Sequence, residues 1–214
     1  MKFNLKRNQQ LIYSVVSMAI FFMALVITSC SKDEEPQKED VPELITKATL
    51  TFTPTSGDLV VVTATDPDGI GVKDLTVDGA INLRKDQTYV LTIQLLNGLA
   101  QPTDDEYNVT DEVESEGDEH QFFFAWTKGV FADPSGNGNI DNGTDALNYS
   151  GGATSKDKNG RALGLTTTWT TTDAVIDDAS FHVLLKHQPD LKSDTSDSNS
   201  GETDLDITFV VNVE

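Results

Sequence analysis

The sequence is poor in cysteine and in basic residues. Cys30 is the single cysteine among 214 residues, which excludes an intrachain disulfide and a zinc site built from several cysteines. Fifteen Lys and Arg stand against 35 Asp and Glu, giving a formal net charge of −20. Because such a surface repels a phosphate backbone, we expect no nucleic-acid partner.

Motifs for covalent catalysis and for phosphate binding are also missing. The chain has no Gly-x-Ser-x-Gly elbow and no Gly-x-x-x-x-Gly-Lys loop. Carboxylates are so numerous that no single pair indicates acid–base chemistry. We therefore predict that the protein is not an enzyme. Its 37% apolar content is enough for a modest core.

The N-terminus has the pattern of a secretory signal. Lys2, Lys6 and Arg7 precede the apolar run Leu11–Ile27, and small residues follow. This order predicts a signal peptide over residues 1–29. The alternative is an uncleaved N-terminal anchor, since the run reaches the lower limit for a membrane span.

The segment Ile27-Thr28-Ser29-Cys30 resembles the bacterial lipobox. The resemblance implies that the Cys30 thiol receives a diacylglycerol, that cleavage follows and that the new N-terminus is acylated. Several acyl chains give stable membrane anchoring where one chain would not. We therefore expect a lipoprotein attached to the membrane through Cys30.

The residues after Cys30 are acidic and indicate a tether. Ser31 follows the cysteine directly, as in outer-membrane signals, and the next acidic residues resemble the export tag of Bacteroidetes-type surface lipoproteins. Residues 30–43 are charged and hold two prolines, so we expect a disordered tether. This predicts a protein on the outer membrane, exposed at the cell surface.

Strand patterns fill the remainder of the chain. Alternating apolar and polar residues predict strands separated by turns at Ala48–Thr53, Leu59–Thr65, Val72–Val77, Thr88–Leu96, His120–Trp126, Ala146–Tyr149, Leu163–Thr172, Ser180–Gln188 and Asp204–Val213. In the strand Ser180–Gln188, the alternation of side chains places Phe181, Val183, Leu185 and His187 on the inward face. Leu184 and Lys186 are expected to point outward. In the last strand the odd-numbered residues 205–213 face inward and Asp204 faces solvent.

The helical signal is confined to Asn108–Asp118, with Asn108 as the N-cap. Seven to nine short strands with at most one short helix predict an all-β fold, an antiparallel immunoglobulin-like β-sandwich over residues 44–214. Two acidic loops, Gln101–Glu119 and Pro189–Thr203, interrupt the strands.

The stretch from Asp133 to Asp141 resembles an EF-hand-like calcium loop. Asp133, Asn137 and Asn139 place oxygens at alternate positions, and Asp141 stands at the ninth. Thr144 occupies the twelfth place, where a carboxylate is expected, and no helices flank the loop. A calcium loop and a long Asn/Gly turn both fit this pattern.

Two further patterns have a metal-binding and a structural interpretation. Asp66-Pro67-Asp68-Gly69, with Asp74, fits a calcium corner between strands or a type I turn. His120, His182, Glu202 and Asp204 could together supply a zinc site if their strands lie side by side. His182 and His187 are five residues apart, hence on opposite faces of a strand. The structural interpretation is that these are histidines at strand ends, bonded to the backbone.

Residues 43–214 resemble a family of uncharacterised Bacteroidetes-type surface lipoproteins, sometimes loosely grouped with periplasmic-binding folds. The similar segments are Glu43-Leu44-Ile45-Thr46, Asp66-Pro67-Asp68-Gly69, Glu119-His120-Gln121-Phe122-Phe123-Phe124, Gly164-Leu165-Thr166-Thr167 and Gly201-Glu202-Thr203-Asp204. The resemblance implies a cell-envelope location and brings no catalytic residues.

Together these features predict a surface-displayed module that binds a ligand or a metal, with calcium and zinc as candidate ions. Candidate partners are a cationic ligand and an outer-membrane transporter to which the module is accessory. The alternative is a structural or adhesion β-sandwich that binds no small molecule.

Overall fold

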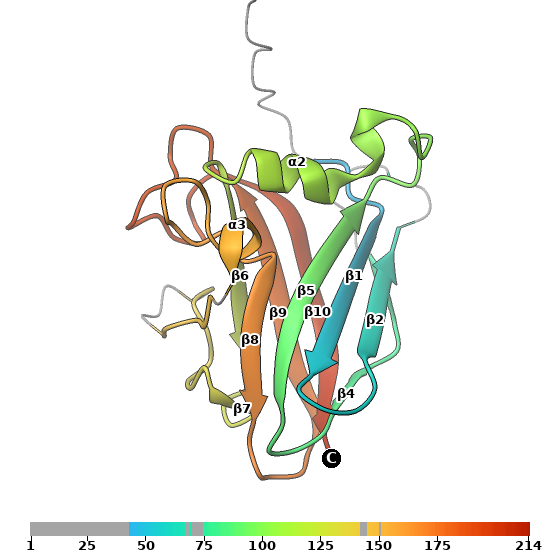
Figure 1. Cartoon of the computed structure of the whole chain (residues 1–214), viewed down its shortest axis with the longest axis vertical. Helices are drawn as coiled ribbons and strands as arrows, with labels where there is room; N and C mark the ends of the chain where they lie inside the picture. The colour runs from blue at the N-terminus through green and yellow to red at the C-terminus, as the bar shows by residue number, and fades with distance from the viewer. Residues whose placement is uncertain (1–42, 67–68, 70–74, 142–144, 150) are drawn as a thin grey trace, which may run out of the picture. The chain divides into compact units, whose positions relative to one another are not determined.

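The computed structural model describes residues 43–66, 69, 75–141, 145–149 and 151–214. They form two β-sheets packed face to face, which confirms the predicted all-β sandwich (Figure 1). The predicted signal peptide and Cys30 lie outside the described residues, as does the predicted tether except for Glu43.

The first sheet has six strands in the order β3-β2-β1-β5-β8-β7, and all its pairs are antiparallel. Threonine and other β-branched residues fill these strands because they suit a pleated, half-exposed surface. The strands are β1 (Lys47–Pro54), β2 (Val60–Thr65), β3 (Thr76–Asp78), β5 (Thr88–Leu96), β7 (Phe131–Asp133) and β8 (Thr166–Thr171).

The second sheet has four strands in the order β4-β10-β9-β6. The β4–β10 pair is parallel, which is an exception to the fully antiparallel prediction. Short β4 follows β3 along the chain but belongs to the other sheet, so it runs along the edge of β10. The strands are β4 (Ile81–Leu83), β6 (His120–Trp126), β9 (Ile176–His187) and β10 (Glu202–Val213).

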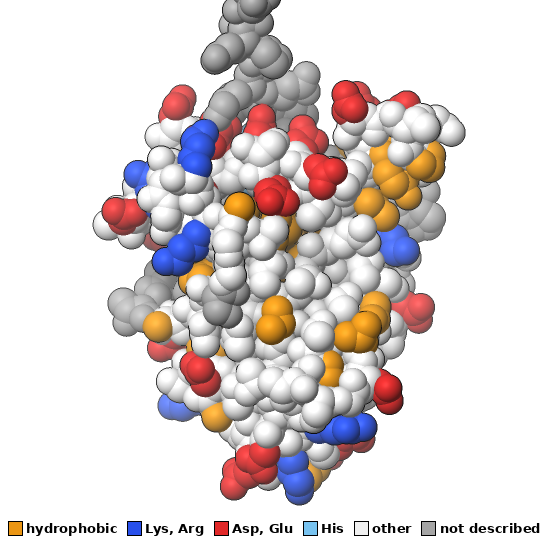
Figure 2. Space-filling view, in the orientation of Figure 1, with side chains coloured by type: hydrophobic (Ala, Val, Ile, Leu, Met, Phe, Trp, Pro, Cys, Tyr) orange, Lys and Arg blue, Asp and Glu red, His pale blue; other side chains and the backbone are white. Residues whose placement is uncertain are grey.

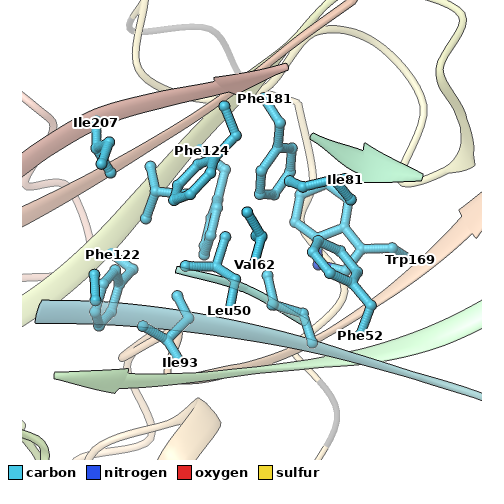
Figure 3. Packing of buried hydrophobic residues seen from close by; sticks show 14 of the residues in the cluster. Leu50, Phe52, Val62, Ile81, Ile93, Phe122, Phe124, Trp169, Phe181 and Ile207 are labelled. Carbon is cyan, nitrogen blue, oxygen red and sulfur yellow. The ribbon is translucent and has the colours of Figure 1, made fainter. Parts of the chain in front are cut away.

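The core lies between the sheets and is rich in aromatic rings (Figure 3). Trp169 of β8 is fully buried and contacts Phe124 and Phe181 edge-on from the opposite sheet. The Trp169 indole N–H donates to the Thr167 hydroxyl at 2.7 Å. The inward phase predicted for β9 and β10 is confirmed, because these residues are buried: Phe181, Val183, Leu185, His187, Leu205, Ile207, Phe209, Val211 and Val213.

Helix α2 (Val109–Ser115) lies across one end of the sandwich, here called the α2 end (Figure 1). Val109 and Val113 are buried, and the Thr110 hydroxyl exchanges hydrogen bonds with the backbone of Leu95 at the end of β5. The predicted helix is therefore confirmed but shorter, and Asn108 holds the N-cap position without a side-chain cap. Two further short helices are η1 (Asp105–Tyr107) and α3 (Gly152–Ser155).

Some predictions differ from the structure. Ala146–Tyr149 forms no strand, and β4 and β7 are strands of three residues that the pattern missed. Asp204 was expected to face solvent but is buried, since a β-bulge lies between Thr203 and Leu205. Leu184 and Lys186 have the predicted outward phase and are nevertheless buried. Of the predicted strand Val72–Val77, residues 72–74 lie outside the described residues, and Thr76 and Val77 belong to β3.

Acidic side chains gather over α2, whereas the middle of the exposed face of the first sheet carries few charges (Figure 2). This difference distinguishes the α2 end as the region of concentrated charge. Within the described residues, no helix is long and apolar enough to cross a membrane.

Candidate metal site

Two buried histidines meet at the α2 end. His120 begins β6 and His187 ends β9, and the antiparallel register pairs them directly. The same register continues inward as Phe122 opposite Leu185, so the histidines occupy the last interior row of this ladder. Their rings stack in parallel, with centroids 4.5 Å apart and an interplanar angle of 4°.

The His120 ring is oriented by a backbone carbonyl. Its Nδ1 lies 3.3 Å from the carbonyl oxygen of Glu116, which can only accept, so Nδ1 donates the proton. In the neutral ring Nε2 then carries the lone pair. That atom lies 3.6 Å from Asp204 Oδ2 and 3.8 Å from Glu43 Oε1. Three electron-pair donors thus converge, an arrangement that favours a cation between them.

His187 faces a second carboxylate. Its Nε2 lies 3.7 Å from Glu119 Oε2, and its side chain is 2% exposed. Among the described residues, neither His187 Nε2 nor Asp204 Oδ2 has a hydrogen-bond partner, although both atoms are buried. Buried polar atoms in native proteins are nearly always satisfied by protein or by ordered water, so these two atoms are positioned to accept a further hydrogen bond or to ligate an ion.

The backbone around the two histidines is fixed by close contacts. The buried Lys192 ammonium donates to the carbonyls of Gly117 and His120 at 2.6 and 2.7 Å and lies 3.2 Å from Asp157 Oδ2. Gly201 has φ +79°, and a Cβ there would overlap the carbonyl oxygen of His187. Glycine therefore lets the start of β10 approach the end of β9 closely.

Ligand atoms of Glu116, His120 and His187 all lie within 4.8 Å of one another. No other group of three His, Cys, Asp or Glu residues among those the structure describes meets this condition. We use "histidine cluster" for these three residues with the adjoining carboxylates Glu43, Glu119 and Asp204. Because an ion binds in the plane of an imidazole, binding by both rings requires one of the parallel rings to turn.

Two carboxylates of the histidine cluster, Glu43 and Asp204, resist ionisation. The pKa of Glu43 is raised to about 8, mainly by burial and also by the charge and hydrogen bond of Glu112 and the charges of Asp204 and Glu116. Burial likewise raises the pKa of Asp204 to about 6, opposed by the backbone N–H of Glu43 and the charge of His187. Acidic groups crowded in this way favour a bound cation or a bound proton.

An acidic groove of about 890 Å³ adjoins the histidine cluster. Its walls include Glu112 and Glu116, so it shares Glu116 with the cluster and Glu112 with the environment of Glu43. The other acidic residues that line it are Asp104, Asp105, Glu106 and Asp111. A concave surface of one charge concentrates counter-ions, which makes the groove a suitable access route for a cation.

The calcium-loop residues are used within the protein. The Asn139 side chain accepts from the backbone N–H of Phe124 at 2.9 Å, and Asn137 donates to Asp141 at 3.1 Å. Asp133 accepts from Asn148 at 3.3 Å. Gly138 forms a bridge with Ala125, so the loop folds back on β6. The loop therefore has the internal hydrogen bonds of a long turn, and calcium binding there stays a prediction; residues 142–144 lie outside the described residues.

Of the predicted zinc set, the structure brings His120 and Asp204 together. His182 lies on the outer side of β9, where its Nε2 is 2.6 Å from Asp206 Oδ1. Glu202 is exposed, and its charge contributes to the raised pKa of Asp204. In the predicted calcium corner, Asp66 Oδ1 accepts from the N–H of Gly69, as in a turn; Asp68 and Asp74 lie outside the described residues.

Sequence reasoning placed His187 inward and considered it with His120 and His182, although the zinc set itself used His120 and His182; it did not identify Glu43, Glu116 or Glu119. The pairing of His120 with His187 could have been found from the two strand ends, had the strand order been known. Glu116 precedes His120 by four residues, in the turn between α2 and β6, and this short separation was the available signal. Glu43 gave no signal, because it is one carboxylate among many.

We predict that Lys192→Met destabilises the fold. The substitution removes the cation beside the buried Asp157 carboxylate, and breaking a buried pair in this way costs about 3–5 kcal/mol. Urea unfolding followed by tryptophan fluorescence measures the loss. Lys158→Met is the matched control, since Lys158 makes an exposed ion pair with Asp118 and should change stability by less than about 1 kcal/mol. Equal effects of the two substitutions would contradict the assigned role of Lys192.

We predict that without added metal the melting temperature falls by a few degrees as pH rises from 5 to 8. The folded state holds the Glu43 and Asp204 protons more tightly than the unfolded chain, so stability is present at low pH and is lost as pH rises through the two raised pKa values. Differential scanning fluorimetry measures the slope. Glu43→Gln should flatten it above pH 6, whereas exposed Glu114→Gln should leave it unchanged; a slope unaltered by Glu43→Gln would refute this cause.

No protein-family model, curated protein or solved structure matches this chain. The site is therefore defined by the geometry of the histidine cluster alone.

Proposed function

We propose that this protein is a lipid-anchored module of the cell envelope that binds a divalent transition-metal ion at the histidine cluster. The observation that carries the proposal is the convergence of two buried imidazoles with buried carboxylates at one end of a rigid sandwich. Imidazole nitrogens suit zinc and its neighbours, whereas calcium prefers an all-oxygen shell. Zinc is therefore the better fit of the two candidate ions.

The anchoring part of the proposal rests on the sequence. The lipobox-like segment ending at Cys30 and the acidic residues after it support attachment to the outer membrane through lipid, with the sandwich displayed at the surface. The resemblance to Bacteroidetes-type surface lipoproteins supports the same location. An outer-membrane transporter that receives the ion is the partner that fits such a module.

The threonine-rich face of the first sheet favours a second candidate, a structural or adhesion module. Thr51, Thr92 and Thr166 lie in register across β1, β5 and β8, on the exposed face that carries few charges (Figure 2). A surface of hydroxyl and methyl groups suits contact with a neutral polymer. This candidate function does not require the histidine cluster to bind metal.

We predict that zinc binds the full-length protein in detergent and raises its melting temperature. A ligand at 100 times its Kd stabilises by about 2.7 kcal/mol. Isothermal titration calorimetry with zinc and with calcium measures binding, and His120→Gln and His187→Gln should each weaken zinc binding at least about 10-fold. His182→Gln is the matched control. No heat with zinc, or equal losses in all three variants, would rule out metal binding at this site.

We predict that protein isolated from its native membrane begins at Cys30 and carries the diacylglyceryl group and an N-terminal acyl chain. Intact-mass analysis with fragmentation of the N-terminal peptide measures both modifications. Cys30→Ser should abolish lipidation and release the protein from the membrane fraction. Recovery of native protein with Met1 still attached, or with an unmodified Cys30, would overturn the anchoring proposal.

A further inference from the structure

Glu43 joins the start of the sandwich domain to the histidine cluster. Its backbone N–H donates to Asp204 Oδ1 at 3.2 Å, and its Oε1 lies 3.8 Å from His120 Nε2. Its side chain is only 13% exposed, although the residue precedes the first strand. Both contacts lead to residues of the cluster, one through the main chain and one through the carboxylate.

The chain just after Glu43 is held differently. The Thr46 N–H donates to the Leu96 carbonyl at 2.9 Å, and the Asp66 N–H donates to the Thr46 carbonyl at 2.8 Å. From Thr46 onwards the backbone is thus part of the hydrogen bonding of the sheet, whatever the state of the histidine cluster. At Glu43 the contacts depend on Asp204 and His120, together with the side-chain hydrogen bond to Glu112.

The groups around Glu43 are mostly acidic, and they oppose ionisation of its carboxylate. Glu112 and Glu116 of α2 and Asp204 of β10 all oppose the negative charge of Glu43. Nε2 of neutral His120 also directs a lone pair toward it. A divalent cation among these groups would convert each repulsion into a shared attraction.

Building on the metal-binding function proposed above, we propose that Glu43 is a ligand of the same ion, so that metal binding fixes the chain where it enters the sandwich. Glu43, which precedes the sheet hydrogen bonding that begins at Thr46, would then be held by a metal-dependent contact. Occupancy of the histidine cluster would in this way be coupled to the order of the chain at the start of the sandwich.

Hydrogen–deuterium exchange of the full-length protein in detergent, with and without zinc, tests this coupling. Zinc should slow exchange in the peptide that spans Glu43 to Ala48, and slowed exchange around His120 reports occupancy of the site. In Glu43→Gln we expect zinc affinity to fall at least about 10-fold. At zinc concentrations that saturate this variant, the His120 region should be protected and the Glu43 region should not.

Two further variants control for indirect effects. Glu114→Gln removes an exposed carboxylate from the same end of the molecule and should retain both protections. Glu43→Asp retains the charge on a shorter side chain and should restore part of the affinity lost in Glu43→Gln. A loss in Glu114→Gln equal to that in Glu43→Gln, with circular dichroism unchanged, would show that the effect comes from general surface charge and that the Glu43 carboxylate is not a ligand.

The outcomes separate this inference from the proposed function. If the wild-type protein binds zinc with unchanged exchange at Glu43, or if Glu43→Gln binds as tightly as wild type, the coupling is refuted and the metal site stands. If the wild-type protein does not bind zinc, both proposals fail together.

Discussion

The arrangement of the α2 end depends on one constraint, the placement of two imidazoles in the last interior row between β6 and β9. Inward of this row the ladder carries apolar residues such as Phe122 and Leu185, which need only close packing. His120 and His187 bring polar nitrogens into the same dry layer, where an unsatisfied polar group is costly. The neighbouring segments place oxygen atoms near these nitrogens: the backbone carbonyl of Glu116 just after α2, the Glu119 carboxylate just before β6 and the Asp204 carboxylate of β10.

Most of these neighbouring groups are carboxylates, and an ionised carboxylate beside a buried histidine is itself a buried negative charge that needs a partner. A neutral His120 places a lone pair beside Asp204 and Glu43, and burial is the main cause of the raised pKa values of these two acids. A proton can relieve one such contact at a time, whereas a divalent ion relieves several at once. Protons and a metal ion would therefore compete for the same atoms, and binding of the proposed metal would release protons from the cluster.

The sequence predicted the layers of the fold better than it predicted the site. Alternation in β9 and β10 identified the interior residues, including His187, because a strand facing a core must repeat every second residue. The three-residue strands β4 and β7 are too short to show that period. Asp204 became buried through a bulge, which shifts a strand without leaving a pattern in the sequence.

The residues of the site come together through strand pairings that no local sequence motif encodes. His120 and His187 are 67 positions apart and meet only because β6 and β9 are neighbours in the sheet. The EF-hand-like stretch shows the converse, since Asn137 and Asn139 have the expected spacing but bond to Asp141 and to the β6 backbone. A linear motif fixes which oxygen atoms are near in sequence, and the fold decides whether they remain available to an ion.

The strongly acidic surface makes it necessary to distinguish the histidine cluster from diffuse cation binding. Exposed carboxylates on a protein of net charge −20 attract any divalent ion, but this attraction is screened by salt over about 10 Å at 0.1 M. The buried imidazoles are shielded from that screening and favour ions with affinity for nitrogen. A cation response that persists at high salt and discriminates zinc from calcium is therefore a property of the cluster, whereas one that disappears with salt belongs to the surface and to the acidic groove.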